Sequence, residues 1–337
     1  MYMFGISKFG FDFGSSSSLI SAPHKGVLVN DPSVVALSMD TKTIIAVGND
    51  AKDMLGKTPE GVISKNPIKF GAISNYKVVE SMIRYFLSKA GYKSLFFNSE
   101  AVVGISDGLT SVEKRAMYEA VMGAGIKKIY LVPNVLLTAI GCNLPIGTSS
   151  GNMVINIGGG TAELAVISFN GIVVSDSIRV GGDSINEAIC IYLKKNYGII
   201  IGDQMAENIK IEVGSALPLI SPIEMEIRGR DAVNGMPKSM IIDTNVVVSA
   251  IKGPLNLIIQ STRHLLERTP PELASDIIDR GILLSGGTSL LRNIDTLITR
   301  AIGITAYISD DPVTSVVNGA SEALKYIDIL YKNVRNP

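Results

Sequence analysis

The stretch that decides the fold is residues 153–167, MVINIGGGTAELAVI, in which two apolar runs flank a turn of three glycines and a threonine. This order predicts a buried strand, a tight turn and a returning strand. Residues 9–20 repeat it as FGFDFGSSSSLI, with Asp12 at the place that Asn156 takes in the later copy. Two copies of one hairpin predict two similar halves of the chain that face each other.

Outside these hairpins, short strand-like runs alternate with helical patterns, which predicts an α/β protein. The later hairpin continues through the turn signal Asn170-Gly171 into a further apolar run. A helix is predicted to start at Thr110, because Thr110 and Glu113 have the spacing of a capping box. The other elements predicted from the pattern are strands at 26–29, 34–39, 43–47, 101–105 and 128–132, and helices at 78–90 and 136–142.

The composition excludes several classes of protein. Of 337 residues 46% are apolar, and 31 basic side chains balance 31 acidic ones, so the basic excess of a nucleic-acid-binding protein is missing. Two cysteines and two histidines offer no zinc cluster and favour a reducing compartment without disulfide bonds. The first residues lack the apolar segment of a secretory signal, and the uncharged residues 129–162 are too often interrupted by proline, asparagine and glycine to span a membrane.

Glycine- and serine-rich turns suit the binding of phosphates. A turn without bulky side chains exposes several backbone N–H groups to an anion, and serine hydroxyls add further donors. Asp12, and Asn156 at the same place in the later copy, are expected to hold Mg²⁺ through water, because Mg²⁺ prefers oxygen ligands and keeps its hydration shell. The residues expected to clamp the phosphates are Ser15, Ser16, Ser17, Gly158, Gly159 and Gly160.

A third glycine turn follows a strand predicted at 282–284. It consists of Gly286, Gly287, Thr288 and Ser289, and it is expected to open a helix that runs through Arg300. Backbone donors at the start of a helix suit an anion or the edge of a nucleotide. A single turn of this kind is common, but three in one chain, two of them duplicates, predict a nucleotide-binding site.

These motifs resemble those of the MreB family, the bacterial actins, within the superfamily that also holds actin, sugar kinases and chaperone ATPases. Residues 12–17, Asp-Phe-Gly-Ser-Ser-Ser, resemble the family's first phosphate loop, usually Asp-Leu-Gly-Thr-Ala-Asn. Residues 153–163 resemble its second phosphate loop, and 285–290 its adenosine loop. Residues 207–215 resemble the helix that flanks the adenosine, whose binding residues here would be Glu207, Asn208, Ile209 and Lys210. Further matches at 30–36, 225–231 and 269–274 extend the resemblance over nearly the whole chain.

The resemblance implies an actin-like α/β fold, with two similar lobes around a nucleotide cleft. Each lobe would have a larger and a smaller subdomain. Lobe I would comprise a large subdomain of 1–30, 70–142 and 306–337 and a small one of 31–69. Lobe II would comprise a large subdomain of 143–180 and 243–305 and a small one of 181–242.

The function that the resemblance implies is a cytoskeletal filament of subunits that bind ATP and Mg²⁺ and that shape or move the cell. Such filaments are expected to be antiparallel double protofilaments in the cytoplasm, on the inner face of the cell membrane. Leu95, Phe96 and Phe97 form an apolar triplet at the place of the loop that inserts into lipid in the family. Packing beneath the following strand explains the triplet equally well.

Two departures from the family pattern concern hydrolysis. Asn156 stands where the second phosphate loop usually begins with aspartate, and Asn134 stands at the second acid of a Glu-Glu-Pro motif. In the family that acid positions and polarises the attacking water together with a threonine, here Thr161. An amide holds a water but has no basicity, and general-base help is typically worth about 10²–10⁴-fold. We therefore predict ATP binding with slow or undetectable hydrolysis, unless a nearby carboxylate such as Glu163 replaces the missing acid.

The alternatives come from the same superfamily. A small-metabolite kinase would need a catalytic carboxylate near residue 134, and Asn134 and Asn156 weaken that reading. A chaperone ATPase would need a peptide-binding domain, for which we expect no room in 337 residues.

Overall fold

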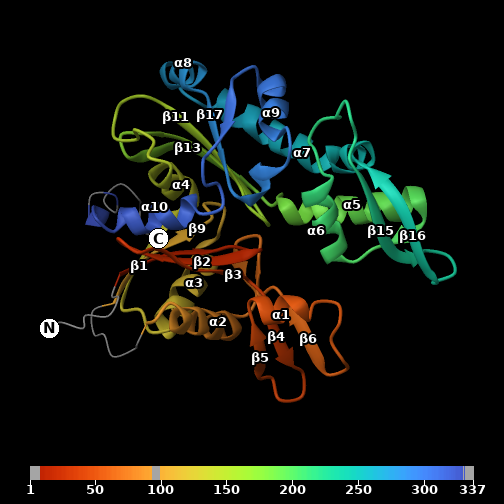
Figure 1. Ribbon diagram of the computed structural model, residues 1–337. Coiled ribbons are helices and arrows are strands. Elements are labelled where there is room, and N and C mark those ends of the chain that lie inside the picture. The colour runs from red at the N-terminus through yellow and green to blue at the C-terminus, as the bar shows by residue number, and fades with distance from the viewer. Residues whose placement is uncertain (1–7, 93–98, 329, 331–337) are drawn as a thin grey trace.

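The computed structural model describes residues 8–92, 99–328 and 330, which form two lobes built on two five-stranded sheets (Figure 1). The apolar triplet Leu95, Phe96 and Phe97 lies outside the described residues. Within the described part of the chain, no helix combines the length and the hydropathy that crossing a membrane requires.

The first sheet has the N-terminal hairpin at its centre. Its order is β10-β9-β1-β2-β3, with β1 antiparallel to β2 and parallel to β9. Phe9, Phe11 and Phe13 lie two residues apart on β1 and enter the same apolar core, because alternate side chains of a strand share a face. The strands are β1 (Lys8–Phe13), β2 (Ser17–Ala22), β3 (Gly26–Pro32), β9 (Glu100–Ile105) and β10 (Lys128–Pro133).

The second sheet has the later hairpin at its centre. Its order is β13-β12-β11-β17-β18, with β11 antiparallel to β12 and parallel to β17. Every residue of β11 and β12 is buried, as expected for strands covered on both faces. The strands are β11 (Asn152–Ile157), β12 (Ala162–Ser168), β13 (Gly171–Ile178), β17 (Ile282–Ser285) and β18 (Ala306–Ile308).

The two sheets share one topology. In each sheet, the two successive pairings on one side of the central strand are antiparallel, and the two successive pairings on the other side are parallel. Their tight turns carry the same hydrogen bond: Gly14 N–H donates to the Ser17 carbonyl at 2.9 Å, and Gly158 N–H to the Thr161 carbonyl at 2.8 Å. The duplication predicted from the two hairpins is therefore present in the fold.

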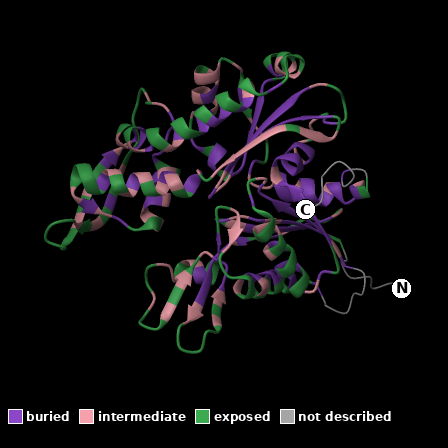
Figure 2. Ribbon diagram, turned by 180° about the vertical axis from the view of Figure 1, so that it is seen from behind, coloured by how far each residue is buried: buried purple, intermediate pink, exposed green. Residues whose placement is uncertain are grey.

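Two helices lie between the sheets and hold the lobes together. These are α4 (Asn134–Gly141) and α10 (Ser315–Ala323), which cross each other closely. Their apolar side chains share one core with side chains from both sheets, among them Val102 of the first and Val154 of the second. Figure 2 accordingly shows these helices and the sheets largely in the buried colour.

Outer helices cover the far face of each sheet. On the first sheet lie α2 (Tyr76–Lys89) and α3 (Ser111–Gly123), and the capping box predicted at Thr110 and Glu113 is confirmed. The second sheet packs against α7 (Thr244–Glu267). The helices α8 (Pro271–Arg280) and α9 (Ile294–Ile302) complete this layer.

Each lobe also carries a smaller group of elements, a three-stranded sheet with the helices that cover it. In lobe I the sheet β5-β4-β6 packs against α1 through a small core of Val34, Ala36 and Ala51. In lobe II the sheet β14-β15-β16 packs against α5 (Gly182–Tyr197) and α6. The elements are β4 (Val35–Ser38), β5 (Ile44–Val47), α1 (Asn49–Asp53), β6 (Val62–Lys65), β14 (Ile199–Ile200), α6 (Asp203–Glu212), β15 (Glu224–Asp231) and β16 (Pro237–Asp243), with a hairpin of β7 (Ile68–Lys69) and β8 (Ala72–Ile73) beside the first group.

Glycine makes the crossing of α4 and α10 possible. A Cβ atom on Gly319 would lie 1.8 Å from the Leu137 carbonyl oxygen, and one on Gly141 would lie 2.0 Å from the Ser315 carbonyl oxygen. Real Cβ atoms do not approach backbone atoms so closely, so any side chain at either position would force the helices apart.

We expect Gly319→Ala to lower the free energy of unfolding by about 1–3 kcal/mol, because the buried helices must separate to admit the methyl group. Urea unfolding followed by circular dichroism measures the change. The control is Gly253→Ala in α7, where a new Cβ meets nothing within 4 Å, and its effect should stay below about 1 kcal/mol. Equal stabilities of the two variants would contradict this account of the crossing.

Candidate functional site

The two phosphate-loop candidates face each other across the lobes at very short range. A Cβ atom on Gly159 would lie 2.8 Å from the Ser16 Cβ, and one on Gly160 would lie 2.5 Å from the Ser15 Oγ and 2.9 Å from the Phe70 backbone nitrogen. Glycine is therefore required at 159 and 160 by the proximity of the opposite turn. The backbone donors of both turns are left facing one cleft.

A cleft of about 500 Å³ opens between these turns, and its wall contains most of the residues singled out from the sequence. It receives strand ends from both central hairpins, the start of α4, one face of α6 and the third glycine turn. The predicted site residues that line it are Asp12, Ser15, Ser16, Ser17, Asn134, Asn156, Gly158, Gly159, Gly160, Thr161, Glu207, Lys210, Gly286, Gly287 and Thr288.

Three predicted binding residues do not line the cleft. In α6, Glu207, Lys210 and Ile211 lie on the cleft side, one helical turn apart, so the intervening residues face elsewhere. Ile209 is fully buried in the core of lobe II, and Asn208 is exposed away from the cleft.

The third of these residues, Ser289, is buried inside its own turn. Its hydroxyl donates to the Gly286 carbonyl at 2.7 Å, so the serine stabilises the turn and does not reach the cleft.

The helix predicted after the third glycine turn is interrupted. A 3₁₀ helix covers Gly287–Leu290, Leu291 is extended, and α9 starts only after Asn293 in a left-handed conformation, so the single helix expected through Arg300 is wrong. Gly286 has φ +83°, and a Cβ there would lie 2.3 Å from the Ile157 carbonyl oxygen. The Thr288 hydroxyl donates to the Gly158 carbonyl at 2.8 Å, which joins the third turn to the second.

The structure adds residues that sequence patterns did not reveal. Asp183 enters the cleft wall from the start of α5, and Arg292 from the loop before α9. Ile211 and Leu290 are 62% and 59% exposed and give the mouth an apolar surface. Of these, Ile211 and Leu290 had a usable signal: Ile211 lies four residues after Glu207 on one face of a predicted helix, and Leu290 ends the stretch 285–290 that resembles the adenosine loop.

Asn134 and Thr161 meet at a buried carboxylate on the cleft floor. The Asn134 Nδ2 donates to the Glu163 Oε1 at 3.1 Å, and the Thr161 Oγ donates to the same oxygen at 3.0 Å. Burial raises the pKa of Glu163 to about 7, although these two hydrogen bonds and the nearby Ser106 favour its charged form. The Asn134 Oδ1 is buried beside Gly104 and has no hydrogen-bond partner among the described residues.

Asp12 lies opposite, at the end of β1. Burial raises the pKa of Asp12 to about 7, and no described lysine or arginine forms an ion pair with it. The Asn156 Oδ1 is a second buried acceptor without a partner among the described residues. These oxygens suit Mg²⁺ held through its own water molecules, because hydration water supplies the donors that both groups lack. No described group of three acidic, histidine or cysteine side chains offers a direct metal cage.

Lys210 brings a cation into the same cleft. Its ammonium group donates to the Gly182 carbonyl at 3.2 Å, and burial lowers its pKa while the neighbouring Glu207 and Asp183 oppose that effect. A polyanion in the cleft would therefore meet one lysine and the backbone donors of three glycine turns.

The raised pKa of Glu163 predicts a dependence of stability on pH. The folded protein retains this proton up to about pH 7, whereas an ordinary glutamate releases it near 4.5, so the free energy of unfolding should fall as the pH rises through this window. Glu163→Gln stays neutral and keeps an acceptor for Asn134 and Thr161. We expect it to reduce the fall by roughly 2–3 kcal/mol, in urea unfolding of protein freed of nucleotide and magnesium. An unchanged slope would contradict the raised pKa.

Comparison with known proteins agrees with this architecture. The MreB/Mbl protein family matches residues 6–332. The cell shape-determining protein MreB of Escherichia coli K12 is 42% identical over 94% of this chain and 93% of its own, and Mbl of Bacillus subtilis 168 is 38% identical over 96% and 97%. The crystal structure of MreB5 of Spiroplasma citri bound to AMPPNP superposes with a TM-score of 0.91, at 31% identity, over 97% of this chain and 98% of that one. The chain belongs to the MreB/Mbl family of bacterial actin homologues.

Proposed function

We propose that this protein binds ATP with Mg²⁺ in the cleft between its lobes, polymerises into cytoskeletal filaments and hydrolyses ATP slowly or not at all. The observation that carries the proposal is the pair of matched turns that face one cleft of about 500 Å³. Family membership supports it, since the E. coli relative is a cell shape-determining protein and MreB5 of Spiroplasma citri has been crystallised with AMPPNP and with ADP.

The phosphates would lie between the two hairpin turns. Ser15–Ser17 and Gly158–Gly160 supply backbone and hydroxyl donors from the two lobes, so a triphosphate would join the lobes through its negative charge. The nucleoside would extend toward α6, where Ile211 and Leu290 give apolar surface. Glu207 and Lys210, on the same face of α6, would add polar contacts there.

Mg²⁺ would be held by water molecules that Asp12 and Asn156 orient, and it would neutralise phosphate charge. Asp12 has a raised pKa because burial disfavours its charge, and a dication nearby would favour the ionised form. The amide of Asn156 contributes an acceptor oxygen without charge, so this side of the site is one negative charge poorer than the usual family pattern.

The residues of the cleft floor support slow hydrolysis. Asn134 directs its amide N–H to Glu163, and its amide oxygen is buried beside Gly104. That oxygen is not basic and takes no proton from the water at the moment of attack. Glu163 is a poor replacement, because one of its oxygens already accepts hydrogen bonds from Asn134 and Thr161 and its raised pKa leaves it partly protonated near neutral pH.

We expect Asn134→Glu to raise the rate of phosphate release by about 10²-fold or more, because it restores a proton acceptor beside Thr161. Phosphate release is followed with Mg-ATP in excess. Asn134→Gln, which adds the same length without a charge, is the matched control and should leave the rate unchanged. A wild-type protein that already releases phosphate at the rate of the glutamate variant would contradict the proposal.

Assembly is proposed as antiparallel double protofilaments in the cytoplasm, on the inner face of the cell membrane. Family membership supports self-association, and the apolar sequence of residues 95–97 supports the membrane contact. The subdomain bounds expected from the resemblance are proposed with it, so that the small subdomains are 31–69 in lobe I and 181–242 in lobe II. The three-stranded sheets found in these two stretches support the division. Membership of the MreB/Mbl family does not support the small-metabolite kinase alternative.

Sedimentation at low micromolar protein concentration tests the filament. We expect the protein to pellet with Mg-ATP and to remain largely in the supernatant without nucleotide, because the nucleotide joins the two lobes. Electron microscopy of the pellet distinguishes filaments from aggregates. A protein that stays monomeric with ATP at ten times that concentration would contradict the proposal.

A further inference from the structure

A second space of about 590 Å³ lies next to the cleft, between the two small subdomains. Its lobe I wall is basic and its lobe II wall is acidic, so the walls attract each other. Burial raises the pKa of Asp183 on the acidic wall, while Lys69 on the basic wall acts in the opposite direction. The charged residues that line this space are Lys52, Lys65 and Lys69 on one side and Asp183, Glu187, Asp203 and Glu207 on the other.

Two contacts cross this space, and both end on Lys52 of α1. The Gln204 Nε2 of α6 donates to the Lys52 carbonyl oxygen at 2.9 Å. The Lys52 ammonium lies 3.3 Å from the Glu207 Oε2. These are the hydrogen bonds and ion pairs that join the two small subdomains within the described part of the chain.

Glu207 belongs to both spaces. It lines the cleft proposed for the nucleotide and also the second space, one helical turn from Lys210 on α6. We propose that Lys52, which does not line the nucleotide cleft, couples closure of the two small subdomains to nucleotide binding by pairing with Glu207. This inference rests on the proposed function, since it takes ATP as the ligand of the cleft.

Closure and nucleotide binding can be coupled because the Glu207 carboxylate has two oxygens. Glu207 can present one oxygen to the cleft while the other pairs with Lys52, so the two contacts do not compete. A nucleotide that fixes the Glu207 side chain removes the rotamer freedom that the ion pair would otherwise have to restrict. Closure then favours binding and binding favours closure by the same factor.

The size of the effect is limited by solvent. The side chains of Lys52 and Glu207 are 40% and 29% exposed, and partly exposed ion pairs contribute modestly. We therefore expect Lys52→Ala to weaken ATP binding by about two- to fivefold, although the residue does not reach the nucleotide cleft. The difference from wild type should shrink at high salt, because salt screens the pair.

The control variant keeps Lys52 and removes a different positive charge from the same wall. Lys65 lines the second space and forms no ion pair with a described residue, so Lys65→Ala should bind ATP as wild type does. Gln204→Ala removes the other contact across the space and should weaken binding in the same direction as Lys52→Ala. Titration of a fluorescent ATP analogue into each full-length variant gives the Kd values.

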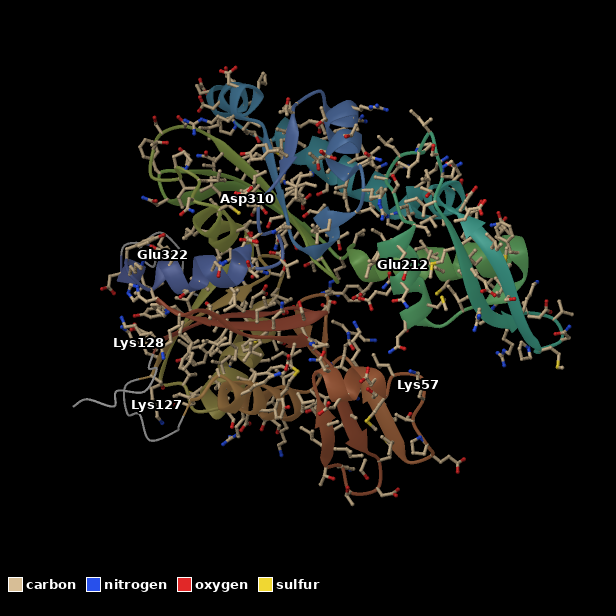
Figure 3. All side chains as sticks on the ribbon, in the orientation of Figure 1. Lys57, Lys127, Lys128, Glu212, Asp310 and Glu322 are labelled. Atoms are coloured by element: carbon tan, nitrogen blue, oxygen red, sulfur yellow. The ribbon has the colours of Figure 1, made fainter. Side chains whose placement is uncertain are left out.

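A distance measurement reports closure directly. Figure 3 shows Lys57 and Glu212 on opposite sides of the gap between the small subdomains, and both are exposed. Spin labels on Lys57→Cys and Glu212→Cys, in a chain with Cys142 and Cys190 replaced by alanine, give the distance by pulsed electron resonance. With ATP present, we expect the distribution to lengthen or broaden for Lys52→Ala and to remain narrow for Lys65→Ala.

The outcomes separate the two proposals. Equal Kd values and equal distances for the Lys52 and Lys65 variants would overturn the coupling and leave ATP binding intact. Failure of the wild-type protein to bind ATP would overturn the proposed function and the coupling with it. Weaker binding and a wider gap in the Lys52 variant alone would support the coupling.

Discussion

The close crossing of α4 and α10 is the constraint on which the rest of the structure depends. Gly141 and Gly319 bring the two helix backbones so near that no side chain fits between them. The helices therefore fill the layer between the sheets and share one apolar core with both lobes. Because α4 starts at Asn134, this packing also sets that residue on the floor of the cleft. The partly buried amide lies there beside Thr161 and Glu163, at the position where the family resemblance leads us to expect a water-activating acid.

Among the described residues, the apolar core that both lobes share lies around these helices, and polar contacts join the lobes at other points. The Ser106 and Ser177 hydroxyls lie 3.1 Å apart, Ser175 donates to Asp107, and Lys52 pairs with Glu207 at the far end. When such polar contacts open, water replaces the lost hydrogen bonds and the net free-energy cost is small, whereas exposing an apolar core to water costs much more. Relative motion of the lobes would therefore pivot on α4 and α10 and open at the small subdomains.

Local chemistry made much of the site predictable. The two hairpins depend on turn residues that are neighbours in sequence, and the hydrogen bonds from Gly14 to Ser17 and from Gly158 to Thr161 span only three residues. Which residues of α6 face the cleft was less predictable. Asn208 and Ile209 belong to the same short motif as Glu207, but they do not line the cleft. The helix expected after the third glycine turn was wrong, because Leu291 becomes extended where the chain crosses to pair beside Ser215.

The sequence by itself determined the duplicated hairpins, the three glycine turns and the amides at positions 134 and 156, because each of these features depends on residues that are neighbours in the chain. The pairing of Asn134 with Glu163 was decided by tertiary structure alone, because 29 residues separate them and only the packing of α4 beneath β12 brings them together. The same holds for Lys52 and Glu207, which lie in different lobes. Contacts between distant segments depend on how whole elements pack, and no local pattern carries that information.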